Sequence, residues 1–109
     1  MPFWKIQDIA QQPNLTLVDW RVIETNKEER HFIGQCLESI GGRVSSAIQD
    51  FDQKSMRGVT RSGRVYQLQG PPGMDPDAIY VLNAWLRVNK VEMTKDVTDE
   101  LPQSAEPPP

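Results

Sequence analysis

The segment from residue 54 to residue 64 carries the side chains best suited to chemistry in this sequence. It holds four cations and no acidic residue, namely Lys54, Arg57, Arg61 and Arg64. Arg61 and Arg64 flank Ser62-Gly63, so a hairpin there would place two guanidinium groups at its tip, where amides and a hydroxyl could help them hold a phosphate or carboxylate. Tyr66 would add a surface on which a nucleic-acid base could stack. We therefore predict a binding site for an anion formed by Lys54, Arg57, Arg61, Arg64 and Tyr66.

The same arginines also have a purely structural interpretation, as solvated charges that discourage aggregation through a sheet edge. A nucleic-acid-binding domain usually has a basic overall balance, whereas this chain has a net charge of −3. Residues 1–90 carry 11 basic and 10 acidic residues, and residues 91–109 carry one basic and five acidic residues. The excess acidity therefore belongs to the C-terminal segment.

No other group of residues forms a catalytic or metal-binding pattern in the sequence. His31 is the only histidine and Cys36 the only cysteine, and they are five residues apart. In a regular strand this odd spacing puts the two side chains on opposite faces, so we expect no Cys–His pair. We expect His31 to be a half-exposed strand residue and Cys36 a small core residue. Turn and helix-cap roles explain the aspartates best, namely Asp50, Asp52, Asp75 and Asp77. The sequence thus predicts no catalytic residue, metal or cofactor.

Short strands are the elements expected to position the basic segment. Leu15–Thr25 alternates apolar and polar residues, and a polar turn joins it to Arg30–Leu37, which predicts a hairpin. Gly34 inside the second strand suggests a bulge or the close approach of another backbone. Three further strands are predicted over Arg43–Phe51, Met56–Arg61 and Arg64–Gln69. Gly63 would supply the positive φ that the last turn needs.

A proline-rich exit ends the predicted sheet, and one helix follows it. Gly70-Pro71-Pro72-Gly73 cannot extend a ladder, because its two prolines donate no backbone hydrogen bonds. Asp75 is a good N-cap before Pro76, and apolar residues then recur at helical spacing. We predict an α+β fold, with an antiparallel sheet of about five strands in meander order and the C-terminal helix packed on one face. A curled half-barrel is the alternative.

One domain is expected, because 109 residues of ordinary globular composition leave no room for a second core. We assign residues 1–14 to an N-terminal lead-in, residues 15–91 to the α+β domain, and residues 92–109 to a disordered, acidic, proline-rich tail. Trp4 in the lead-in would either dock on the core or anchor a partner. A lone cysteine suits a reducing cytoplasm, and no signal-peptide pattern or membrane-spanning apolar run is present. We expect a soluble, cytoplasmic protein with no membrane partner.

The run GRVSSAIQDFD, followed by GVTRSGRVYQLQGPPG and an aromatic-rich helix, resembles small bacterial proteins of unassigned role. The similarity covers about residues 15–90 and leaves the tail outside it. The resemblance implies a bacterial, cytoplasmic protein. It carries no catalytic residue and no activity that could be transferred to this chain.

Three functional hypotheses follow. The preferred one is a non-enzymatic interaction module that holds a protein or other acidic partner on the arginine hairpin. The alternative is a nucleic-acid-binding protein that uses the same residues, with the acidic tail covering the basic surface until it is displaced. The third is a small enzyme with His31, Cys36 or an aspartate as its base, which requires a concave pocket around those groups.

Overall fold

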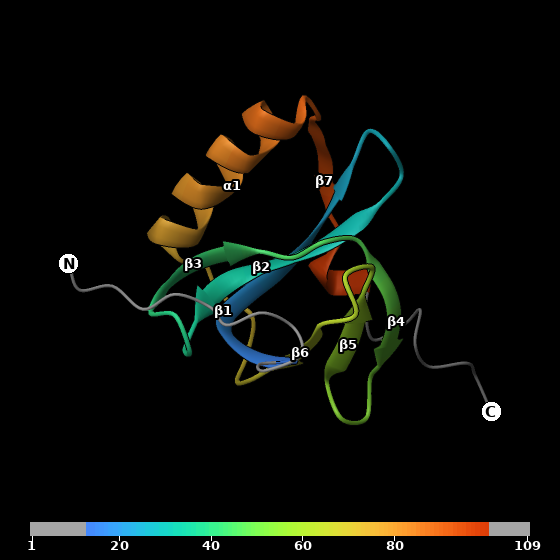
Figure 1. Ribbon diagram of the computed structural model, residues 1–109, viewed down its shortest axis with the longest axis vertical. Coiled ribbons are helices and arrows are strands. Elements are labelled where there is room, and N and C mark those ends of the chain that lie inside the picture. The colour runs from blue at the N-terminus through green and yellow to red at the C-terminus, as the bar shows by residue number, and fades with distance from the viewer. Residues whose placement is uncertain (1–12, 101–109) are drawn as a thin grey trace.

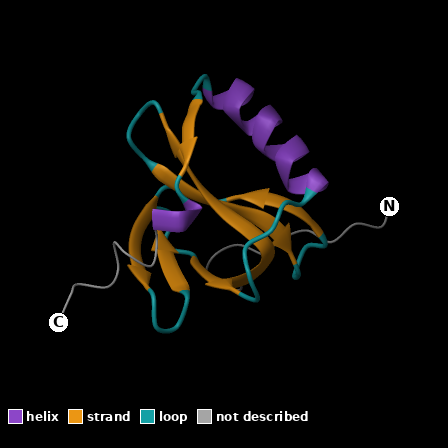
Figure 2. Cartoon of the chain, turned by 180° about the vertical axis from the view of Figure 1, so that it is seen from behind, coloured by secondary structure: helices purple, strands orange, loops and turns teal. Residues whose placement is uncertain are grey.

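The computed structural model describes residues 13–100, which form an α+β fold with a largely open sheet of mixed direction (Figure 1). Its strands are β1 (Asn14–Thr25), β2 (Arg30–Cys36), β3 (Gly41–Val44), β4 (Ile48–Asp52), β5 (Arg57–Thr60), β6 (Val65–Leu68) and β7 (Met93–Asp96). The helix α1 (Pro76–Asn89) connects β6 to β7, and a short 3-10 helix, η1 (Thr98–Glu100), follows β7. In Figure 2, α1 lies by itself along one side of the strands. Within the described residues, neither helix is long and apolar enough to cross a membrane.

The sheet is built around β1. The strand order is β3-β2-β1-β6-β5-β4, and β7 pairs with β1 in addition. The first part of β1 runs parallel to β6, whereas its last part pairs antiparallel with β7. The predicted α+β class is confirmed, but the predicted meander of about five antiparallel strands is imprecise, because the sheet has seven strands and contains a parallel pair. Alternation within each strand could not reveal this pair, since its partners Asn14 and Val65 are far apart in the sequence.

The third predicted strand, Arg43–Phe51, is in fact two strands. Ser45 interrupts it, because its hydroxyl accepts a hydrogen bond from the backbone N–H of Phe32 at 2.9 Å, where a regular ladder would use a carbonyl. Only three residues connect β3 to β4, although these strands occupy opposite ends of the strand order. The sheet consequently curls, while remaining largely open.

The core has two parts, one inside the curled sheet and one between the sheet and α1. The inner cluster comprises Leu15, Leu17, Trp20, Val22, Phe32, Cys36, Tyr66, Leu68 and Val97. The outer cluster comprises Ile23, Ile33 and Leu82, with Trp85 packed against it. Successive residues of β2 alternate between the two clusters, as strand geometry requires. The predictions that the helix covers one face of the sheet and that Trp20 and Cys36 are core residues are confirmed.

Gly34 marks a close approach between β2 and β1. A Cβ atom at Gly34 would lie 3.0 Å from the carbonyl oxygen of Val18 and 3.1 Å from the Cα of Trp20. The register of the pair shifts between Val18 and Arg21, where Asp19 adopts a φ of 49°. The predicted close approach is thus confirmed, and the bulge lies in the facing strand β1.

The proline-rich exit fastens the chain to the bulge of β1 before the helix begins. The indole N–H of Trp20 donates to the carbonyl oxygen of Gly70 at 3.0 Å, and the N–H of Gly73 donates to the carbonyl oxygen of Trp20 at 3.2 Å. Asp75 then caps α1, since its carboxylate accepts the N–H of Ala78 at 2.8 Å. The predicted N-cap and helix start are confirmed.

Residues 92–100 differ from the expectation that a disordered tail begins at residue 92. They contain β7, which pairs with β1, and Val97, which is fully buried. The Nε of Arg21 donates to the Asp96 carboxylate at 2.6 Å, and the Thr98 hydroxyl accepts the N–H of Val22 at 3.0 Å. These long-range contacts order a stretch whose own composition is too polar to do so. Residues 1–12, which include Trp4, and residues 101–109 lie outside the described part of the chain, so the predictions for them stay predictions.

Candidate functional site

The predicted basic residues do not form a single cluster. Arg61 lies in the turn between β5 and β6, whereas Lys54 and Arg57 lie at the other end of β5. A strand of four residues spans roughly 13 Å, so the two ends of β5 belong to separate surfaces. Arg57 also donates from Nε to the Gln67 side-chain oxygen at 3.2 Å, across the ladder.

Arg64 and Tyr66 are buried, with exposed fractions of 6% and 2%. The Tyr66 ring packs on Phe32 at a centroid distance of 5.8 Å, and its hydroxyl accepts a hydrogen bond from the Nε of Arg43 at 2.9 Å. Burial in the inner core contradicts the prediction that Tyr66 offers a stacking surface. Arg64 still follows the β5–β6 turn, but its side chain is withdrawn from solvent and is not the exposed guanidinium that was predicted.

The amides of the β5–β6 turn are used within the fold. The N–H of Ser62 donates to the Ser46 hydroxyl at 3.1 Å, and the N–H of Gly63 donates to the Thr60 carbonyl oxygen at 2.8 Å. Gly63 has a φ of 91°, which confirms the positive φ predicted for this turn. These amides shape the turn and are not free for a ligand. Because Arg64 is buried, the exposed cation of this turn is Arg61, whose side chain is 55% exposed.

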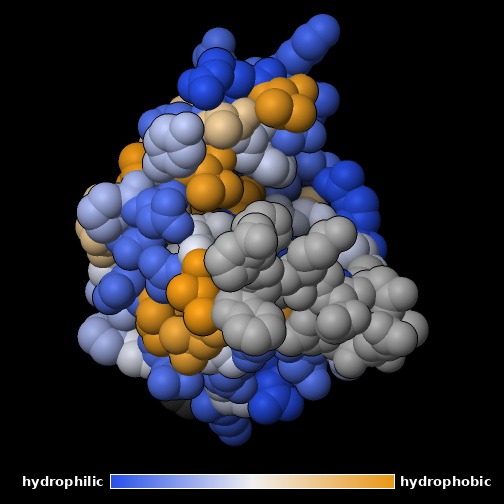
Figure 3. Space-filling model, turned by 60° about the vertical axis from the view of Figure 1, so that its left-hand side comes forward, coloured by the Kyte–Doolittle hydropathy of each residue, from blue (hydrophilic) through white to orange (hydrophobic). Residues whose placement is uncertain are grey.

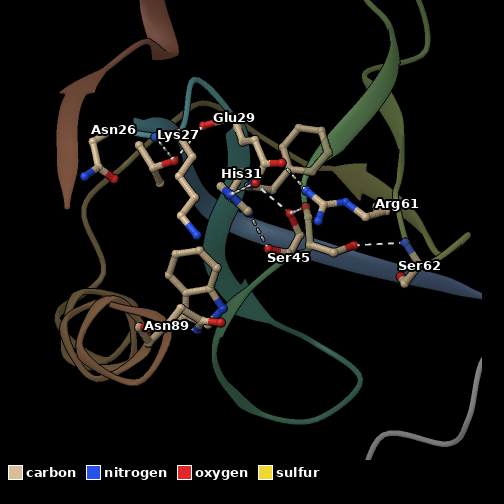
Figure 4. A network of polar contacts seen from close by, with 12 residues as sticks. Asn26, Lys27, Glu29, His31, Ser45, Arg61, Ser62 and Asn89 are labelled. Atoms are coloured by element: carbon tan, nitrogen blue, oxygen red, sulfur yellow. Dashed lines mark hydrogen bonds and ion pairs between the residues drawn. The ribbon is translucent and has the colours of Figure 1, made fainter. Parts of the chain in front are cut away.

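A polar pocket of about 270 Å³ lies beside Arg61. It is formed where the β1–β2 turn, the segment between β3 and β4, the β5–β6 turn and the end of α1 come together. Its lining residues are Thr25, Lys27, Glu29, His31, Ser46, Ala47, Arg61, Trp85, Asn89 and Val91. Figure 4 shows Lys27, Glu29 and Arg61 around His31, with Asn89 on the neighbouring helix.

His31 is buried at 3% exposure, which corrects the expectation of a half-exposed strand residue. The alternation of β2 turns it toward α1, where its ring and that of Trp85 pack edge to face at a centroid distance of 4.7 Å. Its Nδ1 atom lies 2.8 Å from the Ser45 carbonyl oxygen. Because a carbonyl oxygen can only accept, Nδ1 carries the hydrogen, and Nε2 of the neutral ring presents a lone pair.

The Nε2 atom of His31 has no hydrogen-bond partner among the described residues. The nearer oxygen of the Glu29 carboxylate is 4.0 Å away, which is too long for a hydrogen bond. Burial lowers the pKa of His31, and the opposing effects of the Ser45 carbonyl and the Glu29 charge are smaller. At neutral pH the ring therefore lines the pocket as an uncharged, buried acceptor.

Glu29 holds Arg61 at the side of the pocket. The Nη2 of Arg61 donates to the Glu29 carboxylate at 2.5 Å, and this hydrogen bond lowers the pKa of Glu29. The backbone N–H of Arg61 also donates to the carbonyl oxygen of Ala47 at 2.7 Å. Side chain and backbone are thus both anchored, which fixes the direction of the guanidinium group.

Lys27 and Asn89 complete the polar lining from opposite sides. Lys27 belongs to the β1–β2 turn, where its backbone N–H donates to the Thr25 hydroxyl at 3.3 Å. Asn89 lies in the last turn of α1, and its amide donates to the Trp85 carbonyl oxygen at 2.8 Å. With Lys27, Arg61 and the Glu29 carboxylate, the charged lining residues carry one more positive than negative charge.

The pocket does not pair His31 with the cysteine. Cys36 is fully buried in the inner cluster, on the opposite face of β2, as the odd spacing predicted. Within residues 13–100, no group of three or more His, Cys, Asp or Glu side chains could hold a metal ion.

A second depression, of about 290 Å³, lies on β4 and β5 and includes Arg57. Asp50 and Asp52 also line it, so its charges are mixed. Asp52 is engaged in the adjoining turn, since it accepts hydrogen bonds from the N–H of Lys54 at 3.1 Å and the hydroxyl of Ser55 at 3.0 Å. The turn role predicted for Asp52 is confirmed.

Sequence reasoning singled out Arg61 and His31, and it missed Lys27, Glu29, Trp85 and Asn89 as their neighbours. The polar run Asn26-Lys27-Glu28-Glu29 gave a turn signal but no sign of what the turn would face. The sequence could predict that His31 and Ile33 share one face of β2, because they are two residues apart in a strand. The position of that face under Trp85 depends on how α1 packs, and local patterns do not contain that information.

Comparison with protein-family models, curated proteins and solved structures found no significant match to this chain. The resemblance to small bacterial proteins accordingly stays a prediction.

Proposed function

We propose that the chain is a non-enzymatic binding domain that holds one acidic group of a partner molecule in the pocket beside Arg61. The observation that supports this most is that Arg61 and Lys27 line one pocket, with the guanidinium of Arg61 held in place by Glu29. A guanidinium group has five N–H donors in a planar fork. Donors beyond the one that Glu29 accepts are suited to a carboxylate or phosphate oxygen.

The volume of the pocket limits what it can enclose. About 270 Å³ is slightly less than the ~300–1,000 Å³ of pockets that enclose a whole drug-sized ligand. The space is appropriate for a small ion, for one acidic side chain, or for the charged end of a larger molecule. A protein partner would therefore insert a single acidic group, and the surrounding turns would contact the rest of its surface.

Other described surfaces support a binding function less well. Large apolar side chains such as Ile40, Tyr80 and Val88 are exposed. On the face drawn in Figure 3, however, the apolar atoms of the described residues form separate patches divided by hydrophilic atoms. A pocket with fixed polar groups is a more specific feature than such scattered apolar exposure.

Nucleic-acid binding through the predicted residues has weaker support than binding of a single acidic group. A single-stranded nucleic acid needs cations along a groove and aromatic rings on its surface. Here Lys54 and Arg57 are separated from Arg61 by the length of β5, and Tyr66 is in the inner core. Binding to an oligonucleotide that falls steeply with added salt and requires Arg57 would favour this alternative.

The proposal is tested by titrating inorganic phosphate and acetate into the 15N-labelled full chain and following the amide signals by NMR. We expect saturable shifts at Lys27, Glu29 and Arg61. Arg61→Ala should weaken binding about tenfold or more, because it removes a charged hydrogen-bond donor. The matched control is Arg57→Ala, an exposed arginine on the same hairpin, which should leave binding unchanged. Equal losses in the two variants, or no saturable shift, would contradict the proposal.

A further inference from the structure

The buried Nε2 atom of His31 restricts which acidic groups the pocket can accept. We infer that the pocket selects an acidic group that still carries a hydrogen, of the hydrogen-phosphate type, over sulfate and carboxylate. This inference rests on the proposed function, and it adds the chemical class of the ligand.

The orientation of the imidazole ring is fixed from within the fold. Nδ1 donates to the Ser45 carbonyl oxygen at 2.8 Å, and the ring packs edge to face on Trp85 at 4.7 Å. Nε2 is thereby directed away from Ser45 as a lone pair, and no described residue donates to it. A buried acceptor without a partner is unfavourable, so a ligand that brings an O–H or N–H donor gains a hydrogen bond there.

An anion that has hydrogen-bond acceptors but no donor interacts unfavourably with Nε2 of His31. A sulfate or carboxylate oxygen would set its own lone pair against that of Nε2, unless His31 first took up a proton. Burial of His31 opposes that protonation, as the lowered pKa of the ring reflects.

The charged groups around the ring do not make protonation of His31 favourable. The β1–β2 turn supplies Glu29, whose charge favours a protonated ring, and Lys27, which is a further cation in the pocket lining. The β5–β6 turn supplies Arg61, whose charge opposes protonation of the ring. The residues that α1 contributes, Trp85 and Asn89, are uncharged. The neutral ring is thus the form that a ligand meets near neutral pH.

A hydrogen-phosphate group carries both the donor that Nε2 of His31 requires and the acceptors that Arg61 and Lys27 require. Its O–H can donate to Nε2 of His31, while its other oxygens accept from Arg61 and Lys27. Inorganic phosphate keeps an O–H throughout the neutral range, whereas sulfate of the same shape has none. A phosphate monoester loses its last proton with a pKa of about 6, so it satisfies Nε2 only in its monoanionic form.

The test compares inorganic phosphate with sulfate at pH 7.5 and equal ionic strength, again by NMR on the full chain. We expect phosphate to bind about tenfold or more tightly. His31 is the only histidine, so its ring nitrogens give one identifiable pair of 15N signals. Phosphate should move the Nε2 signal while the ring stays in its Nδ1–H form.

A phosphate monoester, phenyl phosphate, separates the two sources of this chemistry. Tighter binding than inorganic phosphate at pH 6.0, with weakening by pH 8.0, would assign the pocket to monoesters. Binding of inorganic phosphate in preference to phenyl phosphate at both pH values would assign it to the free ion. Either result supports a hydrogen-phosphate ligand.

Sulfate that binds as tightly as phosphate at pH 7.5 would overturn the inference and leave the proposed function intact, because the pocket would still hold an anion. Failure of phosphate, sulfate and acetate alike to bind would overturn both. His31→Gln supplies a second test, because an amide can donate as well as accept, and the preference for phosphate over sulfate should disappear. The wild-type comparison decides the matter even where this buried substitution impairs folding.

Discussion

Gly58 of β5 lies directly against the ring of Phe32 in β2, so a methyl group at Gly58 would overlap that ring. The two strands are not neighbours in the sheet, and the contact exists because the sheet curls around the inner core. We predict that Gly58→Ala lowers the free energy of unfolding by about 1–3 kcal/mol, as overpacking of a core does. Urea denaturation measures the change. The control is Val59→Ala, on the partly exposed next residue, and an equal effect of both variants would argue against the contact.

The stability of the fold should depend on the protonation of His31. Its pKa is lower in the folded state than the ordinary value of 6.5, mainly because the ring is buried. As the pH falls below about 6.5, the unfolded chain takes up a proton that the folded chain does not, so stability decreases. Urea denaturation at pH 7.5 and pH 5.5 should therefore give the lower free energy of unfolding at pH 5.5.

Two features isolate the contribution of His31 in that experiment. The pKa of Glu29 is lowered from 4.5 by its hydrogen bond with Arg61, so this carboxylate stays ionised over the whole interval. His31→Gln should abolish most of the difference between the two pH values. Stability that is unchanged or higher at pH 5.5 in the wild-type chain is incompatible with a buried neutral ring.

Thr98 should be important for the attachment of β7 to β1. Its hydroxyl accepts the N–H of Val22 at 3.0 Å and donates to the Asp96 carboxylate at 2.5 Å. Thr98→Val keeps the shape and leaves a buried N–H without this acceptor, which should cost about 1–3 kcal/mol of unfolding free energy. Thr98→Ser keeps the hydroxyl and should cost clearly less, as measured by thermal or urea unfolding. If the two variants lose the same stability, the hydrogen bond is not the cause.

Asp75 should stabilise the start of α1 through its side chain. Its carboxylate accepts the N–H of Ala78 at 2.8 Å, and its φ of −101° lies in the extended region typical of an N-cap. Asp75→Ala should lower the free energy of unfolding by about 1 kcal/mol, whereas Asp75→Ser should retain most of it. Circular dichroism during urea denaturation follows both variants. A serine variant as unstable as the alanine variant would contradict the capping role.

Individual strands, turns and the helix start could be predicted from the sequence, because the patterns that indicate them lie among neighbouring residues. The alternation of Leu15–Thr25, the glycine in the β5–β6 turn and the Asp75-Pro76 helix start each involve neighbouring residues, and each matches the structure. The parallel pairing of β1 with β6 and the docking of β7 depend on residues far apart in the chain. Alternation alone therefore could not predict them.

The candidate site was predictable only in part for the same reason. Arg61 could be placed at a hairpin tip, but its partner Glu29 comes from a different turn. Arg64 and Tyr66 looked exposed, because a short hairpin by itself does not indicate which of its faces is covered. The curl of the sheet turns Tyr66 inward onto Phe32, and the side chain predicted to stack on a ligand instead fills the core.

The pairing of β1 with three other strands has a consequence for how the chain acquires its structure. The hairpin with β2 can form as soon as residue 36 is available, but the other edge of β1 waits for residues 65–68, which pair with its first part, and residues 93–96, which pair with its last part. Such distant contacts make folding slow, because the entropy cost of closing a long loop is incurred before the favourable energy of the contact is gained. During synthesis, β1 therefore leaves the ribosome before β6 and β7 and keeps one hydrogen-bonding edge open until the last of its partners has been translated.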